Sequence, residues 1–173
     1  NSYIDKKIAK KNAMLIFKKT KCDAVKIESN GKNFDIIKCL VEIGIPVMGH
    51  IGFTPQYYKT FKAQGLVENE RIKLINQAIK IEKAGAFSLV LECVKKSVAK
   101  DITKILKIPT IGIGASNYCD GQILVTDDML GLSGFYPRFV KKFARLDNII
   151  EKSIQKYKKA VLNKNFPNNK NNY

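Results

Sequence analysis

Apolar residues recur along this chain with two spacings, one typical of helices and one typical of strands. Ile4, Ile8, Leu15 and small alanines recur at helical spacing among lysines, so residues 2–19 predict an amphipathic helix. In Ala84–Val94, AGAFSLVLECV, a glycine stop after a helical segment leads into a short apolar run, which predicts a buried strand. Glu92 stands near the end of this predicted strand. The two spacings alternate along the chain, and so should helices and strands.

The other elements follow from the same reasoning. Asn33 can cap a helix that Gly44 ends, and Asn69 starts a helix with Ile72, Ile75 and Ile79 facing inward. Further strands are expected at residues 24–28, 46–50, 109–115 and 122–125, and further helices at residues 97–106, 137–146 and 148–162. Repeated βα units predict an α/β fold with a parallel sheet, either doubly wound or closed as a barrel.

The length and the order of elements bound the domain organisation. A chain of 173 residues suggests one domain, which we place at residues 1–162, followed by a polar, asparagine-rich tail at residues 163–173 that we expect to be poorly ordered. A βα unit starts with a strand, but this chain starts with a predicted helix, and its first residue is Asn1 instead of methionine. It is also shorter than the roughly 250 residues of a complete (βα)8 barrel. We therefore expect a partial barrel that lacks the N-terminal strands.

The charge of the chain admits two interpretations. The formal net charge is +16, and arginine occurs only at Arg71, Arg138 and Arg145, so lysine dominates. A basic surface attracts phosphate and is compatible with nucleic-acid binding. However, no binding motif and no pattern of interleaved aromatic and basic residues is present. Lysine, asparagine and isoleucine all have A/T-rich codons, so mutational drift in an A/T-rich genome explains the charge as well.

Cysteine usage and hydropathy indicate a cytoplasmic protein without a membrane partner. Cys22, Cys39, Cys93 and Cys119 form no CxxC pair and show no metal-ligand spacing. They are therefore interpreted as reduced, mostly buried thiols. No apolar run is long enough to cross a bilayer, and the N-terminus lacks the pattern of a signal peptide.

Four polar residues stand near the ends of predicted strands, where parallel α/β folds keep their chemistry. Lys26 and Glu28 are two residues apart and share a face of the first strand, while His50 ends the second and Glu92 the third. Together they suit a small anionic substrate held by a cation or metal, with one carboxylate free as a base. Lys26 and Glu28 could equally be a structural ion pair, and His50 a hydrogen-bonded structural histidine.

Glycines in the run PTIGIGA at residues 109–115 suggest open space along one strand face. Gly112 and Gly114 lack the third glycine that opens a helix, so a dinucleotide-binding loop is rejected. By alternation they share a face with Thr110, and this nearly bare face would suit a wall beside a ligand.

Six segments carry a resemblance to a known family. They are VKIE at Val25–Glu28, IPVMGHIGFTPQ at Ile45–Gln56, KAQG at Lys62–Gly65, AGAFSLVLECV at Ala84–Val94, IPTIGIGAS at Ile108–Ser116 and CDGQILVTDDMLGL at Cys119–Leu132. In this order they closely resemble the ketopantoate hydroxymethyltransferases. The end of the chain, from Phe166 to Tyr173, is also similar to the C-terminus of that family.

The resemblance implies a (βα)8 TIM-type barrel of the phosphoenolpyruvate/ketoacid-barrel kind, assembled as a homo-oligomer that is a decamer in the family. It implies transfer of a hydroxymethyl group from 5,10-methylenetetrahydrofolate to 3-methyl-2-oxobutanoate, with Mg²⁺, on the route to pantothenate and coenzyme A. By motif, Lys26 matches a lysine that contacts the ketoacid, and His50 a histidine beside it. Glu28 matches an acid of the magnesium site, and Glu92 matches the proton acceptor.

The chain departs from the family pattern in ways that bear on activity. The two aspartates that bind magnesium directly in the family lie in an N-terminal segment that this chain lacks, so we expect the chain alone to be inactive. Ser29 and Asn30 stand where glycines are expected, and the segment from Gln56 to Lys62 is shorter than usual. Two alternatives stay open: another Mg²⁺-dependent ketoacid lyase or mutase on a similar barrel, and an inactive basic fragment that binds nucleic acid.

Overall fold

Five parallel strands form one sheet in the computed structural model, which describes residues 2–58 and 60–172. The sheet follows chain order, so each strand pairs with the next one along the sequence. The strands are β1 (Val25–Glu28), β2 (Val47–Gly52), β3 (Ser88–Glu92), β4 (Thr110–Ile113) and β5 (Gly121–Gln122). All five overlap the ranges predicted from the sequence.

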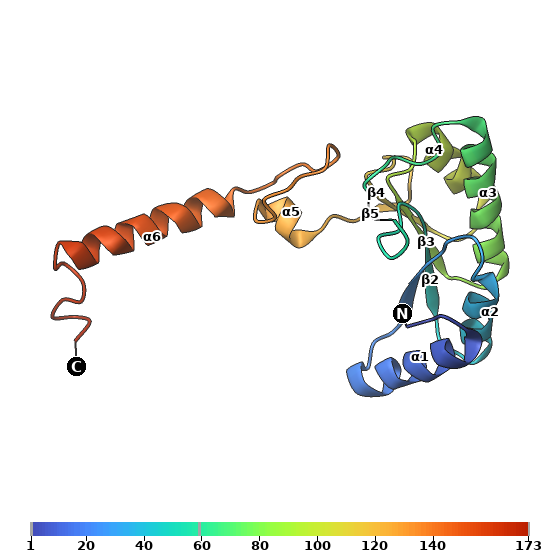
Figure 1. The fold of residues 1–173 in the computed structure, drawn as a ribbon, viewed down its shortest axis with the longest axis horizontal. Coiled ribbons are helices and arrows are strands. Elements are labelled where there is room, and N and C mark those ends of the chain that lie inside the picture. The colour runs from blue at the N-terminus through green and yellow to red at the C-terminus, as the bar shows by residue number, and fades with distance from the viewer. Residues whose placement is uncertain (1, 59, 173) are drawn as a thin grey trace. The chain divides into compact units, whose positions relative to one another are not determined.

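Helices connect the first four strands. Helix α2 (Phe34–Glu42) joins β1 to β2, α3 (Glu68–Lys83) joins β2 to β3, and α4 (Lys96–Ile105) joins β3 to β4. These three helices lie along one side of the sheet, and α1 (Lys6–Thr20) lies beside α2 (Figure 1). Parallel strands joined by helices confirm the predicted α/β class and fit a partial TIM-type barrel.

The two faces of the sheet have different partners. Ile27, Ile51 and Leu89 point to the helical side and are at most 3% exposed. Gly49 belongs to the same side, because a Cβ atom there would lie 2.5 Å from Ile81 of α3. Neighbouring residues on a strand point to opposite faces. His50 therefore projects from the other face, away from the helices.

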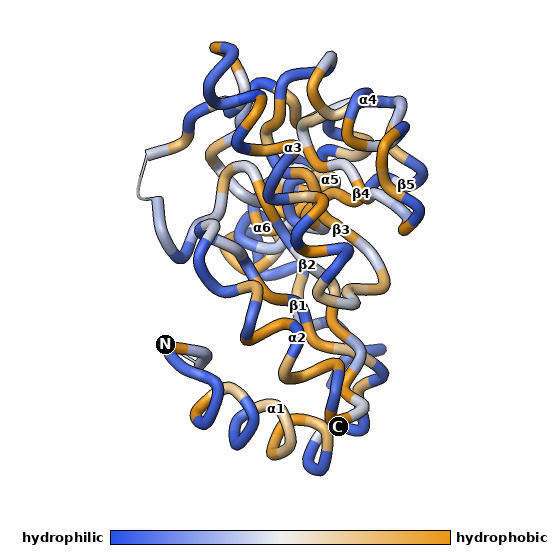
Figure 2. The backbone as a smooth tube through the Cα atoms, turned by 90° about the vertical axis from the view of Figure 1, so that its right-hand side faces the viewer, coloured by the Kyte–Doolittle hydropathy of each residue, from blue (hydrophilic) through white to orange (hydrophobic). Residues whose placement is uncertain are grey.

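The first helix buries its alanines rather than its large apolar residues. Asp5 caps α1 by accepting a hydrogen bond from the Ile8 N–H at 2.8 Å. Within the apolar set predicted from the sequence, Ala9 and Ala13 are buried, whereas Ile8 and Leu15 are exposed, and so is Ile4 just before the helix. Hydrophobic and hydrophilic residues alternate around the turns of α1 (Figure 2). Small side chains allow close packing. The predicted amphipathic helix is confirmed, and the alanines form the buried part of its apolar set.

A similar shift occurs on α3. Ile75 and Ile79 are half-buried and pack against the core as predicted, but Ile72 is 48% exposed. The buried residues of this helix are Leu74, Ala78 and Ile81. Both sets recur at helical spacing, so periodicity alone could not decide between them. On α4, by contrast, Val98 and Ile102 are buried as predicted, while Ile105 is exposed.

The chain divides into two compact units, Asn1–Ile123 and Leu124–Tyr173, and the second contains α5 (Thr126–Leu130) and α6 (Leu146–Leu162). The helix predicted at residues 137–146 is absent. The N–H groups of Phe143 and Ala144 donate instead to the carbonyl oxygen of Met129 in α5, at 2.8 and 3.3 Å. The predicted domain of residues 1–162 does not coincide with this division and stays a prediction. Within the described residues, no helix has the length and apolarity needed to span a membrane.

The cysteines form no disulfide among the described residues. Cys93 and Cys119 are buried, and Cys22 and Cys39 are half-buried. Cys93 directly follows β3 with a φ of 52°. Burial, with a smaller contribution from the charge of Glu92, raises the pKa of the Cys93 thiol to about 12.

Cys93 should therefore resist alkylation in the folded protein. Thiolates are the reactive species, and a pKa near 12 instead of 9 leaves roughly a thousandfold less thiolate at neutral pH. We expect iodoacetamide at pH 8 to modify Cys22 and Cys39 while sparing Cys93, as read by peptide mass spectrometry. Unfolding in urea should make all four react, and modification of native Cys93 as fast as Cys22 would contradict the prediction.

Gly52 at the end of β2 brings two strands into contact. Its φ of 96° lies in the left-handed region, and a Cβ atom there would collide with the carbonyl oxygen of Glu92. Gly44 has a similar φ of 82°, but a Cβ atom there meets nothing within 4 Å.

Substituting each glycine separates the two effects. Gly44→Ala should lower the free energy of unfolding by about 1–2 kcal/mol, from backbone strain alone. Gly52→Ala adds a collision with rigid backbone and should lower it by more, about 3 kcal/mol or above. Urea unfolding of both variants measures the difference. Equal losses would show that the contact at Glu92 relaxes freely.

Candidate active site

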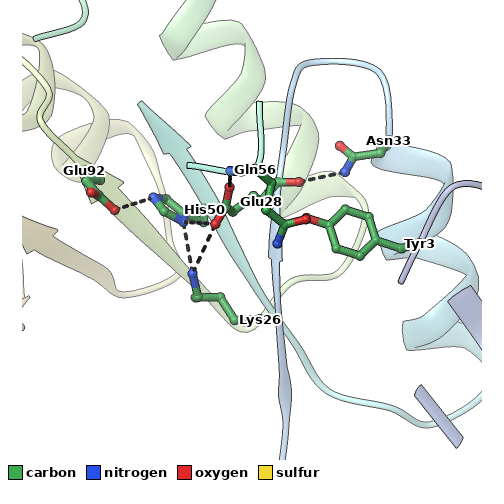
Figure 3. A network of polar contacts seen from close by, with 7 residues as sticks. All are labelled: Tyr3, Lys26, Glu28, Asn33, His50, Gln56 and Glu92. Carbon is green, nitrogen blue, oxygen red and sulfur yellow. Dashed lines mark hydrogen bonds and ion pairs between the residues drawn. The ribbon is translucent and has the colours of Figure 1, made fainter. Parts of the chain in front are cut away.

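Four polar side chains from three neighbouring strands meet at the carboxyl end of the sheet. Lys26 and Glu28 come from β1, His50 from β2 and Glu92 from β3 (Figure 3). In the sheet register Glu28 pairs with His50, and Gly52 pairs with Glu92. Paired residues in parallel strands point to the same face. The sequence predicted this set, and the structure brings all four residues together.

His50 lies at the centre of the cluster and is 1% exposed. Its Nδ1 atom is 3.2 Å from the Nζ atom of Lys26, and its Nε2 atom is 3.2 Å from Oε2 of Glu92. An ammonium group can only donate, so Nδ1 is the acceptor in this contact. The neutral imidazole then carries its proton on Nε2, which faces Glu92.

The Nε2 atom of His50 is left without an aligned hydrogen bond. Although Glu92 Oε2 lies 3.2 Å away, Nε2 has no hydrogen-bond partner within the described part of the chain. Buried N–H groups are rarely left unpaired, and each exception calls for an explanation such as a bound water or ion, local strain or a catalytic role. This N–H is therefore placed to donate to an oxygen of a ligand lying beside Glu92.

Glu28 is buried, with 6% of its surface exposed, and is held from both sides. Its Oε1 atom is 3.9 Å from Lys26 Nζ and 4.0 Å from His50 Nδ1. Its Oε2 atom accepts a hydrogen bond from the backbone N–H of Gln56 at 2.9 Å. Lys26 is a looser partner, because nearly half of its side chain (48%) is exposed. The ammonium group thus has contact both with the cluster and with solvent.

Three further residues support Glu28 and were not assigned to the site from the sequence. Asn33 occupies the N-cap position of α2 but makes no cap bond; its amide donates to the Glu28 carbonyl oxygen at 2.8 Å. Tyr3 donates its hydroxyl proton to the side-chain oxygen of Gln56 at 2.8 Å. Burial raises the pKa of Tyr3, and the charges of Tyr57 and Glu28 add to the effect. Only Gln56 carried a signal, since it ends one of the family motifs.

The glycine face of β4 does not line this site. Gly112 pairs with Leu91, whereas Ile113 pairs with Glu92 and shares its face. A Cβ atom at Gly112 would meet the side chains of Cys119 and Gln122 at 3.0–3.1 Å. The hypothesis of an open wall beside a ligand was wrong at Gly112, because the register places that residue on the opposite face from Glu92.

Metal ligands are scarce at this site. Among the described residues, no group of three or more His, Cys, Asp or Glu side chains could hold a metal ion. Glu28 could offer one oxygen, but magnesium prefers six oxygen ligands in octahedral geometry. These residues therefore do not form a magnesium site by themselves.

The cluster nevertheless combines the groups needed for proton abstraction beside a carbonyl. Glu92, with 14% of its side chain exposed, offers a carboxylate as a base, and His50 offers a buried N–H donor next to it. Lys26 adds a positive charge that solvent can reach. A donor beside a base stabilises the negative charge that develops on a carbonyl oxygen when an adjacent carbon loses its proton.

Comparisons with known proteins identify the family of the chain. The ketopantoate hydroxymethyltransferase family matches residues 1–169. A 3-methyl-2-oxobutanoate hydroxymethyltransferase of Pelagibacter ubique is 48% identical over the whole chain and 67% of its own length. Enzymes of the same name from Zymomonas mobilis and Thermosipho africanus are 50% and 49% identical, over 94% and 93% of this chain and 60% and 62% of their own lengths. The chain thus spans about three fifths to two thirds of these relatives, and it belongs to the ketopantoate hydroxymethyltransferase family.

Proposed function

We propose that this chain provides the ketoacid site of an enzyme that makes 2-dehydropantoate. The reaction transfers the one-carbon unit of 5,10-methylenetetrahydrofolate to 3-methyl-2-oxobutanoate. Water supplies the oxygen of the new hydroxymethyl group, and tetrahydrofolate is released. The observation that carries the proposal is the position of Glu92 beside buried His50, in a chain that belongs to this family. Glu92 Oε2 lies 3.2 Å from His50 Nε2, and this nitrogen has no hydrogen-bond partner among the described residues. The relatives named above are all hydroxymethyltransferases, which does not favour a lyase, a mutase or a nucleic-acid-binding fragment.

Each side chain has a distinct part in the proposed reaction. The exposed ammonium group of Lys26 pairs with the carboxylate of the ketoacid. Glu92 removes the proton from C3, and His50 donates its Nε2 proton as a hydrogen bond to the ketone oxygen, where negative charge develops. The resulting enolate carbon then bonds to the methylene carbon of the folate as one C–N bond of that carbon breaks. Water displaces the second folate nitrogen, which supplies the hydroxyl group of the product and releases tetrahydrofolate. The contacts of Glu28 with Lys26 and His50 keep both groups in place.

Electrostatics supports a role for a cation in this proposal. Two carboxylates and one ammonium group leave the cluster with a formal charge of −1 when His50 is neutral. An anionic ketoacid would be repelled by that excess unless a cation joined it. We propose Mg²⁺ as this cation, with Glu28 contributing one ligand. When bound, it would act as a Lewis acid on the ketone. The remaining ligands would come from the ketoacid, water and residues other than those described.

A homo-oligomer and a cytoplasmic location are also proposed. Helix α6 has no buried residue, and six of its large apolar residues are exposed to solvent. They are Ile149, Ile150, Ile154, Tyr157, Val161 and Leu162. An exposed apolar face of this kind supports association with other copies.

Replacing Glu92 tests the base. The test uses an extended form, in which the N-terminal family segment precedes this chain. In that form Glu92→Gln should reduce hydrogen–deuterium exchange at C3 of 3-methyl-2-oxobutanoate by about 10²–10⁴-fold, because glutamine cannot accept the proton. Ketoacid binding, measured by calorimetry, should persist. Glu42→Gln on the exposed face of α2 is the matched control and should exchange normally. Normal exchange in Glu92→Gln would exclude this residue as the base.

The isolated 173-residue chain should behave differently from the extended form. Because its described residues offer no cluster of three metal-ligating side chains, calorimetry should detect no Mg²⁺ binding at millimolar concentrations. The isolated chain should also give no turnover of ketoacid with 5,10-methylenetetrahydrofolate. The extended form should bind Mg²⁺ and should turn over the ketoacid with 5,10-methylenetetrahydrofolate. Turnover by the isolated chain, or its saturable binding of Mg²⁺, would refute the prediction.

A further inference from the structure

The ring of His50 lies between two carboxylates that can compete for its single proton. Glu92 Oε2 is 3.2 Å from Nε2, and Glu28 Oε1 is 4.0 Å from Nδ1. A neutral imidazole carries one N–H, so a proton on Nε2 faces Glu92, whereas a proton on Nδ1 would face Glu28. The contact of Nδ1 with the ammonium group of Lys26 at 3.2 Å favours the proton on Nε2. The proposed function needs this tautomer, because Nε2 donates to the ketone oxygen.

Lys26 alone is a weak restraint on the tautomer. Nearly half of its side chain (48%) is exposed, and the residue also lines a cavity of about 170 Å³ beside α1. The ammonium group therefore has room to leave Nδ1. If it left and Glu28 moved about 1 Å closer, the carboxylate could accept a charge-assisted hydrogen bond from Nδ1. Nε2 would then turn a lone pair toward Glu92, and the donor would be lost.

Two consecutive hydrogen bonds hold Glu28 away from the imidazole (Figure 3). Its Oε2 atom accepts from the backbone N–H of Gln56 at 2.9 Å. The side-chain oxygen of Gln56 in turn accepts from the hydroxyl group of Tyr3 at 2.8 Å. With Oε2 held in this way, Oε1 stays 4.0 Å from Nδ1 of His50, which is too far for a hydrogen bond.

Tyr3 is the buried end of this connection. It is 9% exposed and belongs to the apolar core, whereas Gln56 is exposed on the segment after β2. Burial raises the pKa of the Tyr3 hydroxyl, and the charges of Tyr57 and Glu28 add to the effect, so the group keeps the proton that it donates. The hydroxyl thus ties an exposed segment to the core at the residue whose N–H holds Glu28.

We propose that Tyr3 is a positioning residue, which keeps the ring proton of His50 on Nε2. It acts through Gln56, whose N–H restrains Glu28. The inference rests on the proposed function for its catalytic consequence, but the tautomer can be measured without substrate, metal or folate. His50 is the only histidine in the sequence, so nitrogen spectra of the untagged chain report on a single imidazole ring.

Removing the hydroxyl group tests the proposal. Tyr3→Phe keeps the aromatic ring in the core, and Gln56→Ala keeps the backbone N–H but removes the acceptor. In ¹⁵N NMR of the 173-residue chain at pH 8.5, the native ring should show a protonated Nε2 and a bare Nδ1. Each variant should lower the ratio of the Nε2–H to the Nδ1–H tautomer about three- to tenfold, the effect of one hydrogen bond. Because both remove the same contact, the double variant should lower it no further.

A matched control removes a hydroxyl group elsewhere. Tyr157→Phe alters an exposed tyrosine of α6 and should leave the tautomer ratio unchanged. In the extended form, hydrogen exchange at C3 of the ketoacid should slow in Tyr3→Phe in proportion to the lost fraction of the Nε2–H tautomer. Tyr157→Phe should exchange at the native rate.

The two readouts separate this proposal from the proposed function. An unchanged tautomer ratio in Tyr3→Phe, or losses that add up in the double variant, would overturn the positioning role even if the native enzyme exchanges normally. A lowered ratio with undiminished exchange would instead remove the His50 N–H from the proposed reaction. Absence of exchange in the native extended form would refute the proposed function and leave the tautomer result standing.

Discussion

Strand β2 is held to β3 by a close backbone contact, and the polar cluster is arranged around it. The N–H of Phe53 donates to the carbonyl oxygen of Glu92 at 2.8 Å, and Gly52 beside it leaves no room for a side chain. This contact continues the register that pairs Gly52 with Glu92. Because β2 lies between β1 and β3, His50 stands between the two carboxylates. A shift of one residue would send His50 to the helical face and dismantle the cluster.

The sheet separates two kinds of free-energy contribution. On the helical side, apolar residues such as Ile51 and Leu91 pack against the helices and supply stability through burial. On the other side, two carboxylates, an ammonium group and an imidazole are partly removed from water, which is tolerated only because they pair with one another. The unpaired Nε2 of His50 is the exception. An unsatisfied buried donor costs stability, and a ligand that accepts its proton would recover that cost.

The net charge of +16 takes on a more local meaning in the structure. The polar cluster at the carboxyl end of the sheet is formally negative when His50 is neutral. Four lysines without ion-pair partners among the described residues line two clefts beside α3, namely Lys32, Lys62, Lys73 and Lys80. This separation follows from where the lysines lie and not from their number.

The sequence alone determined the alternation of strands and helices, the strand ends at Glu28 and Glu92, and the family. These depend on local apolar spacing, glycine positions and motif order, all of which lie within short stretches of chain. Tertiary structure decided which apolar stripe of α1 and α3 is buried, because several stripes have helical spacing and packing selects one. It also assigned Asn33 to the Glu28 carbonyl oxygen instead of a helix cap, and Gly112 to the face away from the site. Such choices depend on register and on neighbours distant in sequence, which no single stretch of the chain encodes.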